Sequence, residues 1–167
     1  MTAIYFDMDG TLADLYGCED WLHDLIDGYT RPYREAKSLL NMRKLGKILN
    51  RLQSKGCHIG VVSWLSKSGT NEYDARVTAT KLRWLARHIG AVQWDEIQII
   101  PYGTPKSTVV QYPEGILFDD EERNRTEWIG AGDSAGLAYD VHEILEVLAN
   151  FEQEVDALRE IQELWGN

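Results

Sequence analysis

Long hydrophobic runs are missing from this chain of 167 residues. The longest apolar stretches, such as Ile59 to Val62 and Ile97 to Pro101, fall far short of the roughly 20 residues that a transmembrane helix needs. The opening MTAIYFDMDG has no basic segment followed by an apolar core, so we expect no secretory signal and no membrane partner. The sequence therefore predicts a soluble protein.

Cysteine is scarce too, and this excludes two further classes. Cys18 and Cys57 are too few and too far apart for a disulfide framework or a close pair of metal ligands. Nor do the histidines show the spacing of a zinc site; they are His23, His58, His88 and His142. Reduced thiols and a cytoplasmic location fit best.

Basic residues are outnumbered, with 17 Lys and Arg against 27 Asp and Glu and a net charge of -10. Broad contact with a nucleic-acid backbone depends on many cations, so we do not expect nucleic acid as a partner. A small phosphorylated substrate stays open, because a bound metal and a few local cations can reverse the field inside one cleft.

Short apolar runs alternate with helix-like segments, which predicts a single α/β domain over residues 1–167. Pro32 is expected to separate the first two helices, and Lys55-Gly56 and Gly90 to end later ones. The expected strands are 3–6, 59–63, 96–100 and 115–118, and the expected helices about 19–29, 33–53, 71–89 and 123–129. This order favours a three-layer sandwich around a mostly parallel, Rossmann-like sheet.

A long helix is expected at about 142–165, where apolar residues recur at alternating spacings of four and three. Two interpretations stay open for it. The helix either packs on its own domain or forms a homodimer through a short heptad-like seam. The residues of the pattern are Ile144, Leu148, Phe151, Val155 and Leu158.

Polar groups of complementary kinds follow the four predicted strands. The set is Asp7 and Asp9, then Ser63, then Lys106, then Asp119 and Asp120. In a parallel sheet these strand ends meet at one edge, where ligands bind. Several carboxylates in one place repel one another, and an all-oxygen site of this kind is what Mg²⁺ prefers. We therefore expect a magnesium site there.

The ordered stretches FDMDGT, VVS, a lysine and ILFDD resemble the four motifs of the haloacid dehalogenase (HAD) superfamily of phosphotransferases. The resemblance implies that Asp7 is a nucleophile that becomes an aspartyl phosphate, and that Asp9 is a general acid and then a base. The resemblance further implies that Thr11 supports the loop or Asp9, that Gly10 permits the close turn, and that the main-chain N–H groups of Met8 and Asp9 face the phosphate. It implies that Ser63 donates a hydrogen bond to the phosphoryl group and that Lys106 neutralises charge. The implied Mg²⁺ ligands are Asp7, the carbonyl of Asp9, Asp119 and Asp120.

Two stretches depart from that pattern. Lys106 precedes Asp119 by only 13 residues, which leaves room for a very short helix or a loop, and Lys67 is the alternative lysine. The stretch GAGDSAG at 130–136 resembles another spelling of the fourth motif, but it follows no strand-like run, so we expect a surface loop.

Room for a lid is limited to about residues 14–38, a minimal helical cap similar to that of the deoxyribonucleotidases. Arg31, Arg34, Tyr29 and Tyr33 are candidate substrate contacts, and Trp64 is a candidate for stacking on a base. The leading hypothesis is a Mg²⁺-dependent phosphomonoesterase for a nucleoside monophosphate or another small ester. The alternatives are a phosphatase for a phosphorylated macromolecule, and a phosphoacceptor switch or binding module without turnover.

Overall fold

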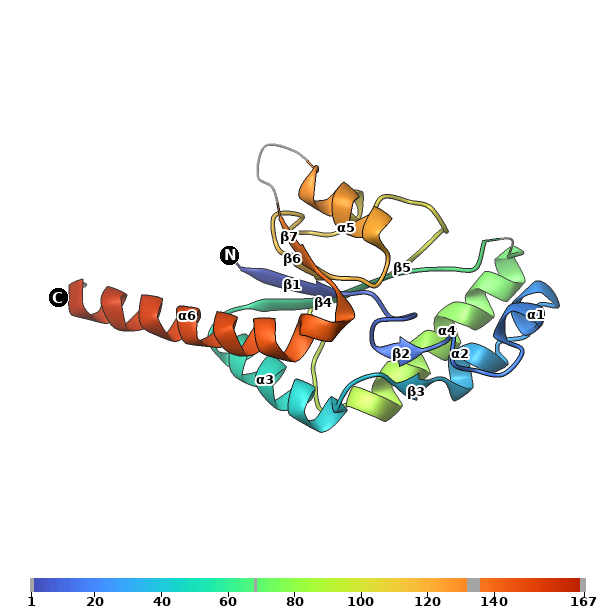
Figure 1. Cartoon of the computed structure of the whole chain (residues 1–167), viewed down its shortest axis with the longest axis horizontal. Helices are drawn as coiled ribbons and strands as arrows, with labels where there is room; N and C mark the ends of the chain where they lie inside the picture. The colour runs from blue at the N-terminus through green and yellow to red at the C-terminus, as the bar shows by residue number, and fades with distance from the viewer. Residues whose placement is uncertain (1, 68, 132–135, 166–167) are drawn as a thin grey trace.

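A computed structural model describes residues 2–67, 69–131 and 136–165. Five parallel strands form one sheet in the order β5-β4-β1-β6-β7, with β1 at its centre (Figure 1). The strands are β1 (Ala3–Phe6), β4 (His58–Trp64), β5 (Glu96–Ile100), β6 (Ile116–Phe118) and β7 (Leu137–Tyr139). The predicted α/β fold is therefore confirmed.

Alternate residues of β1 face opposite layers, which makes the sheet the middle of a three-layer sandwich. Ile4 and Phe6 belong to a core that includes side chains of α3 (Met42–Ser54), α4 (Asn71–Ile89) and the start of α6 (Ile144–Trp165). Tyr5 faces the other layer, where its ring lies 5.6 Å from that of Trp128 on α5 (Glu122–Ile129). Helices thus cover both faces (Figure 1).

Several predicted bounds agree with the structure. β1, β5 and α4 have the predicted limits, and β4 extends the predicted 59–63 by one residue at each end. Lys55 is the C-cap of α3, and Gly56 follows with a positive φ of 90°, which a residue without Cβ adopts readily. Gly90 caps α4 as expected.

The single helix predicted at 33–53 is wrong. The chain instead forms α2 (Arg31–Glu35), a two-residue strand β3 (Lys37–Ser38) and then α3. Asn41 starts α3, because its side chain accepts a hydrogen bond of 3.0 Å from the backbone N–H of Lys44. The first predicted helix is also shorter, α1 (Trp21–Ile26).

Pro32 lies in the first turn of α2 and not between two helices. A first-turn residue needs no backbone N–H for the helix, so proline fits there. Two further strands escaped prediction: β7, and β2 (Ala13–Asp14), which pairs antiparallel with β3. Within the predicted loop 130–136, residues 132–135 lie outside the described residues.

The first half of α6, which follows the 3-10 turn η2 (Val141–Glu143), packs on the domain, with Ile144 and Leu148 fully buried. Glu152 joins it to α3 through Arg51 Nε at 2.6 Å and Lys55 Nζ at 3.2 Å. The second half extends beyond the body of the molecule (Figure 1) and leaves Leu158 exposed. Among the described helices, none combines the length and the apolar character needed to cross a membrane.

Candidate active site

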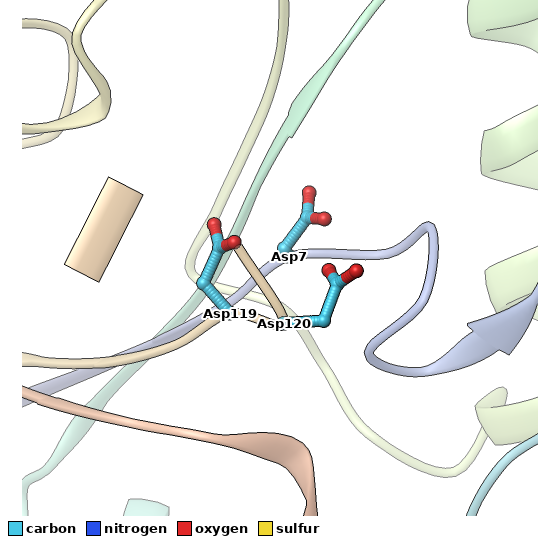
Figure 2. A group of neighbouring side chains, drawn as sticks. All are labelled: Asp7, Asp119 and Asp120. Carbon is cyan, nitrogen blue, oxygen red and sulfur yellow. The ribbon is translucent and has the colours of Figure 1, made fainter. Parts of the chain in front are cut away.

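Three carboxylates meet at one edge of the sheet (Figure 2). Asp7 follows β1, and Asp119 and Asp120 follow the neighbouring strand β6, whose Phe118 is in register with Phe6. One oxygen from each of the three lies within 4.8 Å of the others. The structure thus brings together the acidic residues that the sequence placed at separate strand ends.

Lys106 lies between two of these acids. It begins the short 3-10 helix η1 (Lys106–Thr108), and its Nζ lies 2.9 Å from Asp7 Oδ1 and 2.6 Å from Asp119 Oδ2. Burial alone would lower the pKa of Lys106, but the charges of Asp7 and Asp119 outweigh it and raise that pKa. A charged lysine therefore faces the group. Lys67, the alternative, lies over the ring of Tyr102 instead.

Asp119 and Asp120 are held by different partners. Asp119 accepts hydrogen bonds from the side-chain amide of Asn124 at 3.2 and 3.1 Å and from the backbone N–H of Glu121 at 2.9 Å. The hydroxyl of Thr11 donates to Asp120 Oδ1 at 3.3 Å and accepts from the Asp120 backbone N–H at 3.2 Å. Thr11 therefore supports the loop, but through Asp120 and not through Asp9.

The three carboxylates fit a divalent cation. Burial, followed by the charge of Asp7, raises the pKa of Asp119 to about 6 and that of Asp120 to about 7. Asp7 Oδ1 is buried 2.9 Å from the Lys106 ammonium, and the carboxylates of Asp119 and Asp120 crowd against it with like charge. Carboxylate oxygens that crowd together in this way are the ligands that Mg²⁺ stabilises.

The side chain of Asp9 stands apart from this group. Lys81 Nζ, from α4, lies 2.6 Å from Asp9 Oδ2. Burial raises the pKa of Asp9, and the charge of Lys81 opposes that shift. The two carboxylates of the DMD stretch therefore occupy different environments: Asp7 faces the acidic group and Lys106, whereas Asp9 faces Lys81.

Gly10 lets the turn after the DMD stretch pass close to Asp120. It adopts a φ of 79°, and a Cβ at this position would lie 2.4 Å from Asp120 Oδ2. The side chain of Met8 is buried in the core, so only the main chain of Met8 can face a ligand. The turn is closed by the backbone N–H of Gly10, which donates to the Ala13 carbonyl at 2.8 Å.

The remaining predicted site residues differ in how close they lie to the cavity. Ser63 is fully buried, and its hydroxyl accepts from Lys81 Nζ at 3.0 Å. Trp64 lines the cavity, where its ring lies 4.8 Å from that of Tyr102. Arg34 is half-exposed, pairs with Glu35 at 2.8 Å and is not among the described residues that line the cavity.

Sequence reasoning missed Lys81 and Asn124, both of which are buried. A signal for Lys81 existed, since Val77, Lys81 and Leu85 recur every four residues and all lie on the buried face of α4. A lysine on an apolar helical face needs an anionic partner. The position of that partner was not visible in the sequence.

A cavity of about 680 Å³ opens above these groups. Its floor carries Asp7, Asp9, Lys106, Asp120, Glu121 and Asn124. Its roof comes from within the expected lid at 14–38 and consists of Leu15, Tyr16, Trp21, Leu22, Leu25, Ile26 and Tyr33. The far wall carries Trp64, Leu65, Ser66, Lys67 and Tyr102. The cavity thus combines charged residues at the sheet edge, here called its floor, with apolar and aromatic residues of the 14–38 segment, here called its roof.

Comparison with protein-family models and with curated proteins gives no match. Among solved structures, the chain is similar to D,D-heptose 1,7-bisphosphate phosphatase from Burkholderia thailandensis, with a TM-score of 0.54 and 13% identity over 90% of this chain and 98% of that one. The same enzyme from B. bronchiseptica, complexed with magnesium and phosphate, gives 0.52 and 13% over 90% and 99%. At this identity the likeness shows the fold, and it confirms the fold expected from the resemblance to the HAD phosphatases.

Proposed function

We propose that the chain is a Mg²⁺-dependent phosphomonoesterase that acts through an aspartyl phosphate on Asp7. One observation carries the proposal: Asp7 lines the cavity with a buried oxygen that lies 2.9 Å from the Lys106 ammonium, and it shares the sheet edge with Asp119 and Asp120. A carboxylate poised in this way can attack phosphorus. The fold shared with two phosphatases, one of them complexed with magnesium and phosphate, supports the same conclusion.

The reaction divides into two steps. An Asp7 oxygen bonds to phosphorus while the bond from phosphorus to the ester oxygen breaks, and the carboxyl group of Asp9 gives its proton to that leaving oxygen. Water then attacks the aspartyl phosphate, Asp9 takes up the proton of that water, and inorganic phosphate leaves as Asp7 is restored. Burial raises the pKa of Asp9, which suits it to holding a proton before the first step.

Asp7, Asp119 and Asp120, with the carbonyl of Asp9, would hold Mg²⁺. When bound, the ion would supply charge stabilisation to the phosphoryl oxygens. Lys106 neutralises part of the charge as phosphorus becomes five-coordinate, in keeping with phosphoryl transfer being mainly positioning and electrostatics. The hydroxyl of Ser63 accepts from Lys81 and keeps its own proton for donation to a phosphoryl oxygen in this scheme.

The shape of the cavity favours a small ester. Its volume of about 680 Å³ lies in the ordinary range for small-molecule sites, and side chains of α1 and α2 contribute to its lining. The roof offers Trp21, Leu22 and Tyr33 to the leaving group, and the wall adds Trp64 and Tyr102. A flat, largely apolar leaving group matches these side chains, and a nucleoside monophosphate is our leading substrate.

A panel of nucleoside monophosphates and sugar phosphates, assayed for phosphate release with and without Mg²⁺, tests the proposal. We expect Mg²⁺-dependent release, fastest with nucleotides. Release from none of the esters, by protein whose folding has been verified, would contradict the proposal for small esters. Faster release from sugar phosphates than from nucleotides would retain the reaction and overturn the substrate.

A further inference from the structure

Lys81 is the most deeply buried cation near the cavity, with no exposed surface. It projects from the inner face of α4, between Val77 and Leu85 in the buried stripe. Burying an ammonium group is costly unless it is paired and fully hydrogen-bonded. An apolar residue could fill the same stripe without that cost, so the reason for a lysine lies in its contacts.

The ammonium group of Lys81 has a partner for each of its protons. Its Nζ lies 2.6 Å from Asp9 Oδ2, 3.0 Å from Ser63 Oγ and 2.6 Å from the carbonyl of Trp64. A lysine has three donors, and these three acceptors use all of them. Lys81 also is not among the described residues that line the cavity. It is therefore saturated and has no donor left for a substrate.

Lys106 provides the contrast. It contacts Asp7 and Asp119, lines the cavity, and carries a proposed role on the phosphoryl group. Each carboxylate of the DMD stretch is thus paired with its own buried lysine, from a different element. Without Lys81, the side chain of Asp9 would have no cation within 4 Å among the described residues and would be repelled by Asp7.

We propose that Lys81 is a positioning residue that holds the carboxyl group of Asp9 away from the acidic group and directed at the leaving oxygen. This inference rests on the proposed function. Lys81 acts through Asp9 and does not contact the substrate. Its contribution is accordingly greatest where the leaving oxygen needs a proton.

The dependence on the leaving group gives a direct test. The alkoxide that leaves an alkyl phosphate must receive a proton as the ester bond breaks, whereas p-nitrophenyl phosphate releases p-nitrophenolate, which is stable as an anion. The ratio kcat/KM reports the steps up to the first irreversible one, here phosphoryl transfer to Asp7, so later hydrolysis does not obscure the effect. A general acid contributes typically about 10² to 10⁴ in rate.

The variant Lys81→Met keeps the length of the side chain and removes its charge. We expect kcat/KM to fall on the order of 10²-fold for the alkyl ester and less than about tenfold for p-nitrophenyl phosphate. Lys81→Arg, which restores a cation, should recover part of the loss with the alkyl ester. The rise in Tm caused by Mg²⁺ should match that of the wild type, because Lys81 contacts none of the three clustered carboxylates.

Leu85→Ala is the matched control. Leu85 is buried one turn further along α4, and its truncation weakens the same helix without touching Asp9. We expect a lower Tm and an unchanged ratio between the two esters. If Lys81→Met fails to fold, Lys81→Gln, which keeps a donor but no charge, is measured in its place.

Equal losses with the two esters would overturn the positioning role, and so would a loss of the Mg²⁺-induced rise in Tm. If the folded wild-type protein turned over neither ester, the proposed function itself would fail. The two failures are therefore distinguishable, because the first appears only in the variants and the second in the unmodified chain.

Discussion

Along the floor of the cavity, Asp7, Lys106 and Asp120 come from distant parts of the chain and meet at one sheet edge, whereas the roof comes from one stretch between Leu15 and Tyr33. The floor rests on the central strand β1, which is fully buried. The roof helix α1 contains no buried residue. Few buried contacts make a segment easy to alter, so the roof can change selectivity while the floor keeps its chemistry.

The floor and the roof also differ in charge. The floor places three carboxylates and a lysine together, and this raises the pKa of Asp120 to about 7. The roof offers aromatic and aliphatic side chains such as Trp21, Leu22 and Leu25. Substitutions in the floor should therefore change the rate of reaction, and substitutions in the roof should change the affinity for the leaving group.

The largest effect is expected from Asp7→Asn in the floor. An amide is a poor nucleophile, so turnover should fall by at least about 10³-fold. A loss of this size is within the rate enhancement that a catalytic group can contribute. The fold should survive, because the substitution removes a charge from an acidic group. Phosphate release and Tm, measured side by side, check both statements, and residual turnover above a few per cent would contradict covalent catalysis by Asp7.

The floor should also make Mg²⁺ binding depend on pH. The pKa values of Asp119 and Asp120, about 6 and about 7, are raised, so the folded chain without metal holds more protons than the unfolded chain below about pH 7. These two groups therefore stabilise the fold less as the pH rises through that window. Mg²⁺ needs the ionised groups, so its apparent affinity should fall about tenfold per pH unit between pH 7 and pH 6, where Asp120 is protonated, and more steeply below pH 6, where Asp119 is protonated as well.

Melting curves with and without Mg²⁺, taken from about pH 8 to about pH 5.5, measure this dependence. The rise in Tm should be largest at the alkaline end, and Asp120→Asn should flatten the dependence on pH. Glu160→Gln, an exposed position on α6, is the control and should leave the curves unchanged. A rise in Tm that is independent of pH would show that these carboxylates do not hold the ion.

In the roof, Trp21→Ala should raise KM for a nucleoside monophosphate about tenfold, the equivalent of roughly 1.4 kcal/mol of lost contact, with little change in kcat. His23→Ala is the matched control, because His23 lies on the same helix, is exposed and does not line the cavity among the described residues. Steady-state kinetics of both variants suffice. An equal effect of the two substitutions would show that α1 acts by folding and not by contact.

The smallest effect on activity is expected at the far end of the molecule. A chain that ends after Asp156 keeps the ion pairs of Glu152 and loses the exposed apolar end of α6, so kcat/KM should stay within about twofold. Its mass in solution tests the homodimer that the sequence left open. Self-association through the exposed end of α6 requires a dimeric full chain and a monomeric truncated chain, and a monomeric full chain would exclude it.

The sequence predicted the floor better than the roof, for physical reasons. β1, β5 and α4 are marked by buried runs and clear helix ends, and parallel topology then brings Asp7 and Asp119 to one edge. The segment around α2 was mistaken because Leu39 and Leu40 continue the apolar spacing across the cap at Asn41. Local spacing could not show where one helix ends and the next begins.

Lys81 shows a second limit. Its place in a buried stripe was visible in the sequence, but its partner Asp9 lies 72 positions away. Pairing of charges across such a distance depends on how α4 packs on the sheet edge, and a single sequence does not contain that information. Ser63, by contrast, was singled out because it lies at the end of a predicted strand, and the structure adds its hydrogen bond from Lys81.

The most direct test of covalent catalysis is to stop the reaction with acid during the first turnover and to locate the phosphoryl group by mass spectrometry. We predict that the peptide containing Asp7 carries the phosphoryl group, and that Asp7→Asn carries none. A phosphoryl group on another residue, or phosphate released throughout the first turnover while the Asp7 peptide stays unmodified, would contradict the mechanism.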